Sequence, residues 1–263
     1  MSISVKSDKY RLLERRGQGR GIEYHPWIKT HELSAISVKH RLLGWKIRRI
    51  YQLISTLEYM YFLTVQWEDN VIDIREQFPL LPIEQTIFIA EELGIRYPSL
   101  FKRNGEEIVM TSDFVITIKN GDNIYDIVRT VKTMNDLAKK RTREKLKIEE
   151  EFYNKKGSDW GIVTEQQINF VLANNLDYLY NDYFWAEDRN FDEVQVSNYI
   201  HDFIYFFKKK DYNVYETVNI FDKYMEWDTG ESLNFFKYLL VKKRIFFDFN
   251  KKLDFRYSNF WLP

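Results

Sequence analysis

The chain lacks cysteine and has few histidines, and both shortages limit its chemistry. Without a cysteine among its 263 residues, it has no disulfide, no thiolate metal ligand and no cysteine nucleophile. Its four histidines are not spaced as zinc ligands, so we expect any bound metal to be a hard cation held by carboxylates. The lack of cysteine fits a reducing compartment, and we expect a cytoplasmic protein.

Long apolar runs are missing as well. No run approaches the roughly 18 residues that a membrane span needs, and the first residues, MSISVKSDKYRLLERRG, contain no apolar stretch of the signal-peptide type. We therefore expect no membrane partner. Hydrophobic residues nevertheless make up 44% of the chain, with a mean hydropathy of -0.47, which is typical of a globular protein with a substantial core.

The chain has no net charge, but its charges are unevenly distributed. Residues 1–52 contain 12 Lys and Arg against 4 Asp and Glu, which leaves the remainder acidic. The segment RRGQGRG at 15–21 is too rich in glycine and arginine for a stable helix, and we interpret it as a mobile arm. A basic arm on an acidic body suggests a polyanion partner, although an ordinary solvated arm explains the charge equally well.

Apolar spacing predicts the secondary structure between residues 50 and 180. A helical stripe begins at Ile50 and reaches Val65, and Glu58 lies on it, where a buried carboxylate needs a partner. The other expected elements are a strand at 71–78, a helix at 83–94 closed by Gly94, a hairpin of 107–119 and 124–132 around the turn 120–123, a helix at 137–156 capped by Asp136, a strand at 159–164 and a helix to about 180. This order predicts an α/β sandwich around a mixed sheet.

The pattern changes after about residue 185. Three amphipathic helices are expected, the last of them capped by Ser232, followed by two strand-like runs around 250–252. Three helices and a β-ribbon are typical of a winged-helix domain. We therefore divide the chain into a basic arm at 1–52, an α/β domain at 53–182 and a winged-helix-like domain at 183–263.

Three charged residues suggest a catalytic site. Asp113 lies in one strand of the expected hairpin, Lys132 closes the other strand, and Glu58 is on the preceding helix. Two carboxylates can hold Mg²⁺, which polarises a phosphate and activates water, and a lysine can orient that water or stabilise the developing charge. These are the parts of a metal-dependent nuclease site, although charged residues in strands are also common surface decoration.

Several longer strings carry a family resemblance. They are GRG at 19–21, YHPW at 24–27, LEYMYFL at 57–63, VIDIREQFPLLP at 71–82, MTSDF at 110–114, VK at 131–132 and RTREKLKIEEEFY at 141–153. Over about residues 17–170 the chain resembles the TnsA family, the endonuclease subunit of heteromeric transposases. The resemblance implies a PD-(D/E)XK restriction-endonuclease-like N-terminal domain, followed by a winged-helix-like C-terminal domain that engages the transposition regulator.

The same resemblance implies a function and its partners. In the family this subunit cuts the 5′ ends of the transposon with Mg²⁺, for which Mn²⁺ is expected to substitute, during cut-and-paste DNA transposition. An integrase-fold, TnsB-like transposase subunit cuts and joins the 3′ ends. A TnsC-like AAA+ ATPase links the two subunits to target selection. Transposon-end DNA is the expected substrate.

Residue by residue, the resemblance assigns the site. Glu58 and Asp113 correspond to the metal-binding carboxylates of the family, and Lys132 to its catalytic lysine. Glu149 matches a further acidic position, with an exposed helical charge as the alternative. Glu68 matches another acidic position, although a role in capping or solvating the neighbouring turn is the favoured interpretation.

One position departs from the nuclease pattern. Thr130 stands two residues before the lysine, where most such enzymes have Glu or Asp and this family tends to have Gln. Neither Thr nor Gln is a strong anionic ligand, so we expect the backbone carbonyl of Val131 to complete the oxygen shell of the metal.

Two alternatives to an active transposase nuclease stay open. Thr130 leaves room for a catalytically silent nuclease-fold scaffold that binds DNA and the ATPase. A restriction-type nuclease that works alone is the third possibility. If the chain acts on DNA within a transposase, we expect Arg15, Arg16 and Arg20 of the arm to contact phosphates beside the cut.

Overall fold

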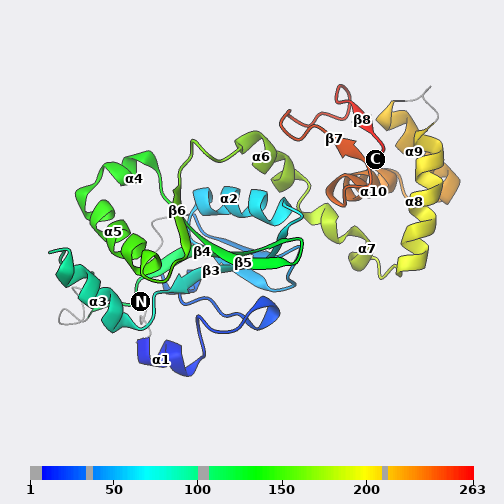
Figure 1. The fold of residues 1–263 in the computed structure, drawn as a ribbon. Coiled ribbons are helices and arrows are strands. Elements are labelled where there is room, and N and C mark those ends of the chain that lie inside the picture. The colour runs from blue at the N-terminus through cyan, green and yellow to red at the C-terminus, as the bar shows by residue number, and fades with distance from the viewer. Residues whose placement is uncertain (1–7, 34–37, 100–106, 209–212) are drawn as a thin grey trace. The chain divides into compact units, whose positions relative to one another are not determined.

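The computed structural model describes residues 8–33, 38–99, 107–208 and 213–263, which form two compact units (Figure 1). The first unit ends at Ile168 and the second begins at Asn169. Sequence analysis places the boundary later, at 182/183. The difference arises from helix α6 (Phe170–Tyr178), whose Asn175 amide donates hydrogen bonds to the carbonyl oxygens of Phe249 and Lys251 in the second unit.

A four-stranded mixed sheet organises the first unit. Its order is β3-β4-β5-β6, antiparallel except for the last pair, which is parallel. The strands are β3 (Val71–Pro79), β4 (Thr111–Asn120), β5 (Asn123–Val131) and β6 (Asp159–Val163). The turn between β4 and β5 is two residues long, and Gly121 has φ +60°, a conformation that favours glycine. The sheet and its hairpin confirm the predicted α/β architecture.

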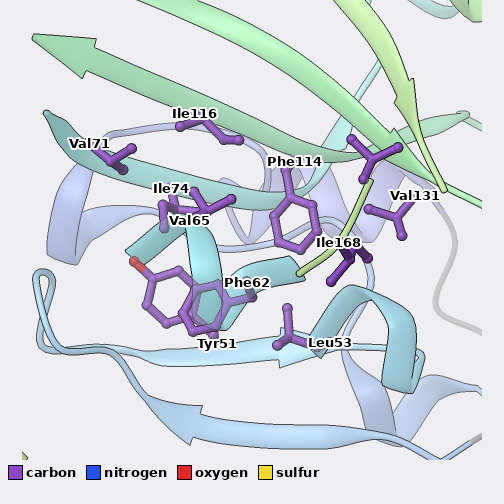
Figure 2. Close-up of a cluster of buried hydrophobic side chains, with 11 residues drawn as sticks. Tyr51, Leu53, Phe62, Val65, Val71, Ile74, Phe114, Ile116, Val131 and Ile168 are labelled. Carbon is purple, nitrogen blue, oxygen red and sulfur yellow. The ribbon is translucent and has the colours of Figure 1, made fainter. Parts of the chain in front are cut away.

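Apolar side chains cover both faces of this sheet, because neighbouring residues of a strand point to opposite sides. On one face, helix α2 (Thr56–Trp67) and the hairpin of β1 (His40–Leu43) and β2 (Ile50–Leu53) pack against Phe114 and Ile116. The rings of Tyr51 and Phe62 pack together in this layer, where their centres are 4.5 Å apart. Figure 2 shows both rings within the cluster.

Two helices cover the opposite face of the sheet. Helices α3 (Ile83–Glu92) and α5 (Lys140–Asn154) pack with Val115 and Val128 of the central strands. The predicted stop of α3 is confirmed, since Gly94 adopts φ +64° just beyond its end. The sheet therefore lies between two apolar layers that cover its faces, and functional side chains are expected at the ends of its strands.

Two predicted helix starts are wrong. Residues Ile50–Leu53 form β2, and α2 begins only at Thr56, because the Ser55 hydroxyl accepts the backbone N–H of Glu58 and so caps the helix. Asp136 does not cap the long helix. It lies inside a short helix, α4 (Met134–Ala138), whose cap is Thr133, and α5 starts afterwards.

The basic N-terminal segment is packed, in contrast to the predicted mobile arm. It contains α1 (Asp8–Leu13) and two short 3₁₀ helices, η1 (Gly21–Glu23) and η2 (Thr30–Glu32). Gly17 lies so close to Pro79 that a Cβ would come within 2.2 Å of the proline ring. The N–H of Trp27 also donates to the carbonyl of Gln77, at 3.1 Å. These contacts fix the segment against β3.

The second unit is built around buried aromatic rings, with Trp185, Phe203, Phe221 and Phe235 packed against one another. The three predicted helices are present. The elements are α6, η3 (Asn181–Phe184), α7 (Trp185–Asp188), α8 (Glu193–Phe207), α9 (Val214–Met225), α10 (Glu231–Val241), β7 (Phe246–Phe247) and β8 (Phe260–Trp261).

Two details of the second unit differ from the prediction. Ser232 does not cap α10 with its side chain. Instead, its backbone N–H and that of Gly230 donate to the carboxylate of Asp222 in α9, at 2.7 and 2.8 Å. The β-ribbon pairs Phe246 with Trp261, so its second strand lies well beyond 250–252.

In the part of the chain that the structure describes, no helix is both long and apolar enough to cross a bilayer.

Candidate active site

One end of the central sheet borders a cavity of about 560 Å³. The first turn of α2, the end of β5 and one side of α5 contribute polar lining residues. Because β4 and β5 are antiparallel, the start of β4 lies beside the end of β5 at this place. Glu58, Asp113 and Glu149 come from these elements and Lys132 directly follows β5, so the fold brings together four residues that lie apart in the sequence.

Asp113 and Lys132 form a direct ion pair. The ammonium nitrogen of Lys132 lies 2.7 Å from Oδ2 of Asp113, and it also donates to the carbonyl oxygen of Val131 at 2.9 Å. The same Oδ2 accepts the backbone N–H of Val131 at 2.7 Å. Burial lowers the pKa of Lys132, but the charges of Asp113, Glu58 and Glu149 outweigh it, so the pKa is raised overall. The lysine therefore stays protonated.

Glu58 is the second buried carboxylate, as its place on the apolar stripe predicts. Its side chain accepts the backbone N–H of Ile54 at 3.0 Å and the hydroxyl of Ser55 at 3.1 Å. Burial, followed by repulsion from the charge of Asp113, raises the pKa of Glu58 to about 8. The two buried carboxylates therefore lie close enough to one another for the charge of one to disfavour the charge of the other.

Gln77 is a buried polar neighbour of Glu58. In the β3–β4 ladder Glu76 faces Phe114 and Phe78 faces Ser112, which places Gln77 opposite Asp113. Its Nε2 donates to Oε2 of Glu58 at 3.3 Å, and its side chain is fully buried. The backbone of Gln77 has φ +50°, an uncommon conformation for a residue other than glycine. Backbone strain of this kind is concentrated at functional sites.

Glu149 is buried, contrary to the alternative of an exposed helical charge. One of its oxygens accepts hydrogen bonds from the hydroxyls of Ser112, at 2.6 Å, and Thr130, and from the indole N–H of Trp160 at 3.0 Å. Burial raises the pKa of Glu149, while these hydrogen bonds oppose the shift. The hydroxyl of Thr130, the position that departs from the nuclease pattern, thus donates to Glu149.

Glu68 does not join this group. It is exposed and follows the last turn of α2, whereas Glu58 lies in the first turn of the same helix. Ten residues at about 1.5 Å each separate their backbones by about 15 Å. The backbone carbonyl of Glu68 accepts from the Lys46 ammonium and from the N–H of Val71, in agreement with a local role at that turn.

The three arginines of the basic segment have different surroundings. Arg15 is exposed, and Arg20 is exposed but pairs with Asp126 at 2.9 Å. Arg16 is only 1% exposed and lies 2.7 Å from a carboxylate oxygen of Glu32. This burial corrects the interpretation of Arg16 as a DNA contact, because its guanidinium is enclosed by the protein.

The oxygen atoms at the site suit a hard divalent cation. No three His, Cys, Asp or Glu side chains gather as a metal centre within the described ranges. Mg²⁺ needs only one or two protein carboxylates, however, because it keeps several of its water ligands. Glu58 and Asp113 could provide two, and the Val131 carbonyl accepts from the same Lys132 ammonium as Asp113.

Sequence reasoning missed Gln77 and the donors around Glu149. The sequence indicates Gln77 only as a polar residue within the strand-like run VIDIREQF. Its contact with Glu58 depends on how α2 packs on the sheet, which the sequence does not reveal. Ser112 and Trp160 meet Glu149 only because β4, β6 and α5 converge.

Comparison with known proteins gives matches over both units. A family model described as "TnsA-like endonuclease N terminal" matches residues 68–165, and one described as "TnsA endonuclease C terminal" matches residues 167–249. The transposon Tn7 transposition protein TnsA of Escherichia coli is 39% identical over 171 residues, which is 65% of this chain and 61% of that protein. Asp113, Lys132 and Glu149 lie within the N-terminal match, and Glu58 precedes it.

Proposed function

Since the chain is TnsA-like in both of its parts, we propose that it is the Mg²⁺-dependent endonuclease subunit of a heteromeric transposase and cleaves the 5′ ends of a transposon. The observation that carries the proposal is the buried group of Glu58, Asp113 and Lys132 beside a cavity at the sheet end. We assign the first unit to the PD-(D/E)XK nuclease fold and the second to a winged-helix-like domain.

Each residue has a defined task in this proposal. Bound Mg²⁺ would supply Lewis acidity toward the scissile phosphate and toward water. Glu58 and Asp113 would hold the cation, with the Val131 carbonyl as a third oxygen. Lys132, kept protonated by Asp113, places a positive charge where negative charge develops on the phosphate. Glu149 fixes Thr130 and hence the end of β5.

The proposed partners follow from the same relationship. Transposon-end DNA is the substrate, and a TnsB-like integrase-fold subunit and a TnsC-like AAA+ ATPase complete the machinery. Arg15 and Arg20, both exposed, are retained as candidate phosphate contacts.

Metal binding and cleavage together test the proposal. Asp113→Asn keeps the shape of the side chain but removes its charge, so calorimetric titration with Mn²⁺ should show saturable binding by the unaltered chain and none by the variant. Cleavage of transposon-end DNA, with the partner subunits present, should fall at least about a hundredfold. Asp122→Asn, in the exposed turn between β4 and β5, is the matched control.

A catalytically silent scaffold is the second candidate, and Thr130 favours it, because its hydroxyl is bonded to Glu149 and supplies no anionic ligand. Normal cleavage by Asp113→Asn would rule out the assigned site. Absence of both metal binding and cleavage in the unaltered chain, with DNA and partners present, would favour the scaffold.

A further inference from the structure

Lys145 is the lysine of α5 that faces the active-site cavity. Thr142, Lys145, Leu146 and Glu149 are spaced by three and four residues and line the same cavity as Glu58. Lys145 lies one helical turn before Glu149, so their Cβ atoms are about 6 Å apart. Its side chain lines the cavity and keeps contact with solvent.

The other two lysines of α5 have carboxylate partners. Lys140 lies 3.8 Å from an oxygen of Glu144, and Lys147 lies 2.9 Å from an oxygen of Glu150. No carboxylate lies within ion-pair distance of Lys145 among the residues with described positions. Within the described ranges, therefore, the ammonium group of Lys145 has no carboxylate partner.

The electrostatic surroundings of Lys145 agree with this geometry. Partial burial, followed by the positive charges of Arg141 and Lys132, lowers its pKa. Asp136, the acidic residue on the same side of the cavity, is already paired with Lys139 at 2.7 Å and with the Thr133 hydroxyl at 2.9 Å. Lys145 thus presents a positive charge to a cavity whose other lysine, Lys132, is already paired with Asp113, and an anion placed beside Lys145 would be attracted to it.

We propose that Lys145 binds the phosphate that neighbours the cleaved phosphate on the same DNA strand, and so holds this strand across the cavity. This inference rests on the proposed function and adds to it a substrate-binding residue outside the catalytic group. A phosphate is the appropriate ligand, because a lysine ammonium on a flexible stem binds phosphate as a point charge.

The salt dependence of DNA binding by the full chain tests the assignment. Binding of a short duplex is measured in EDTA over a series of KCl concentrations, so that no strand is cut. Loss of one phosphate contact in Lys145→Gln should reduce the slope of log K against log salt by about 0.9. If the unaltered chain and the variant bind equally at 1 M salt, where phosphate contacts contribute nothing, this difference in slope lowers the affinity of the variant about eightfold at 0.1 M salt.

Two further variants make the result specific. Lys145→Arg keeps the charge and should retain the slope of the unaltered chain. Lys147→Gln removes a charge from the same helix, two residues away, and should leave the slope unchanged because Lys147 already pairs with Glu150. An unaltered slope in Lys145→Gln, or an equal loss in Lys147→Gln, would overturn the inference.

The test also separates this inference from the proposed function. If the unaltered chain cleaves transposon ends with its partners while Lys145→Gln binds and cleaves normally, only the role of Lys145 fails. If the unaltered chain neither binds duplex nor cleaves it with its partners, the proposed function fails, and the role of Lys145 fails with it.

Discussion

At the scale of single residues, the two carboxylates of the candidate site are unequal. Asp113 accepts the Lys132 ammonium and the backbone N–H of Val131, both at 2.7 Å, so its charge is well compensated. Glu58 is equally buried but receives weaker donors, among them the Gln77 amide at 3.3 Å. Since two adjacent carboxylates resist joint ionisation, the proton is retained by Glu58.

The raised pKa of Glu58 predicts a pH-dependent stability in the absence of metal. Its pKa is about 8 in the folded chain and 4.5 without perturbation, so between these values the folded state binds a proton that the unfolded state has lost. The free energy of unfolding should therefore fall as pH rises from about 5 to 8, by up to about 1.4 kcal/mol per pH unit.

Denaturant unfolding in EDTA checks this expectation. Glu58→Gln should be more stable than the unaltered chain at pH 8 and should lose the Glu58 contribution to the slope. The same pH slope in both proteins would contradict it. Glu68→Gln, an exposed carboxylate at the other end of α2, is the matched control.

The sequence predicts those site residues that a local pattern identifies, but it does not predict burial that depends on tertiary packing. Glu58 is recognisable because a carboxylate interrupts an apolar stripe. Asp113 and Lys132 follow from a hairpin whose turn is visible in the sequence. Arg16 illustrates the opposite case, because three arginines within six residues look equally exposed until the fold places Glu32 beside one of them.

At the scale of elements, helix ends are fixed by side chains that local pattern identifies only in part. The helical apolar spacing runs from Ile50 to Val65, through both β2 and α2. The helix nevertheless begins only after Ser55, which caps it. The start of α10 depends on Asp222, which belongs to the preceding helix. A contact of this kind joins two helices, so neither sequence segment reveals it alone.

Asp222 should therefore be important for the second unit. Asp222→Ala leaves the backbone N–H groups of Gly230 and Ser232 without their acceptor, and it should lower the stability of that unit by about 1–3 kcal/mol. Hydrogen exchange of the amides in α9 and α10 measures the effect. Asp228→Ala, an exposed acid in the same loop, should change little, and equal effects of the two substitutions would refute the cap.

At the scale of the whole molecule, each unit has its own core. Aliphatic and aromatic side chains on both faces of a sheet stabilise the first unit, whereas the second is held together mainly by aromatic rings between helices. Separate cores allow one unit to lose stability while the other keeps it.

Removal of Arg16 tests this independence. Arg16→Ala removes the nearer cation of the buried Glu32 carboxylate and leaves Arg11 at 3.2 Å, so the first unit should lose about 1–3 kcal/mol. Hydrogen exchange in the second unit should not change. Arg15→Ala, at the exposed neighbouring position, is the control. Faster exchange throughout both units would show that they unfold as one.

The Lys132 ammonium has a practical consequence for the biochemist. It already lies against Asp113 and the Val131 carbonyl, so the fold does not rely on a divalent ion to balance that carboxylate. The protein should tolerate purification and storage in chelator, unlike small domains whose folding requires metal. The divalent ion can then be the last component added to an assembled complex, and its addition defines the start of a synchronised time course.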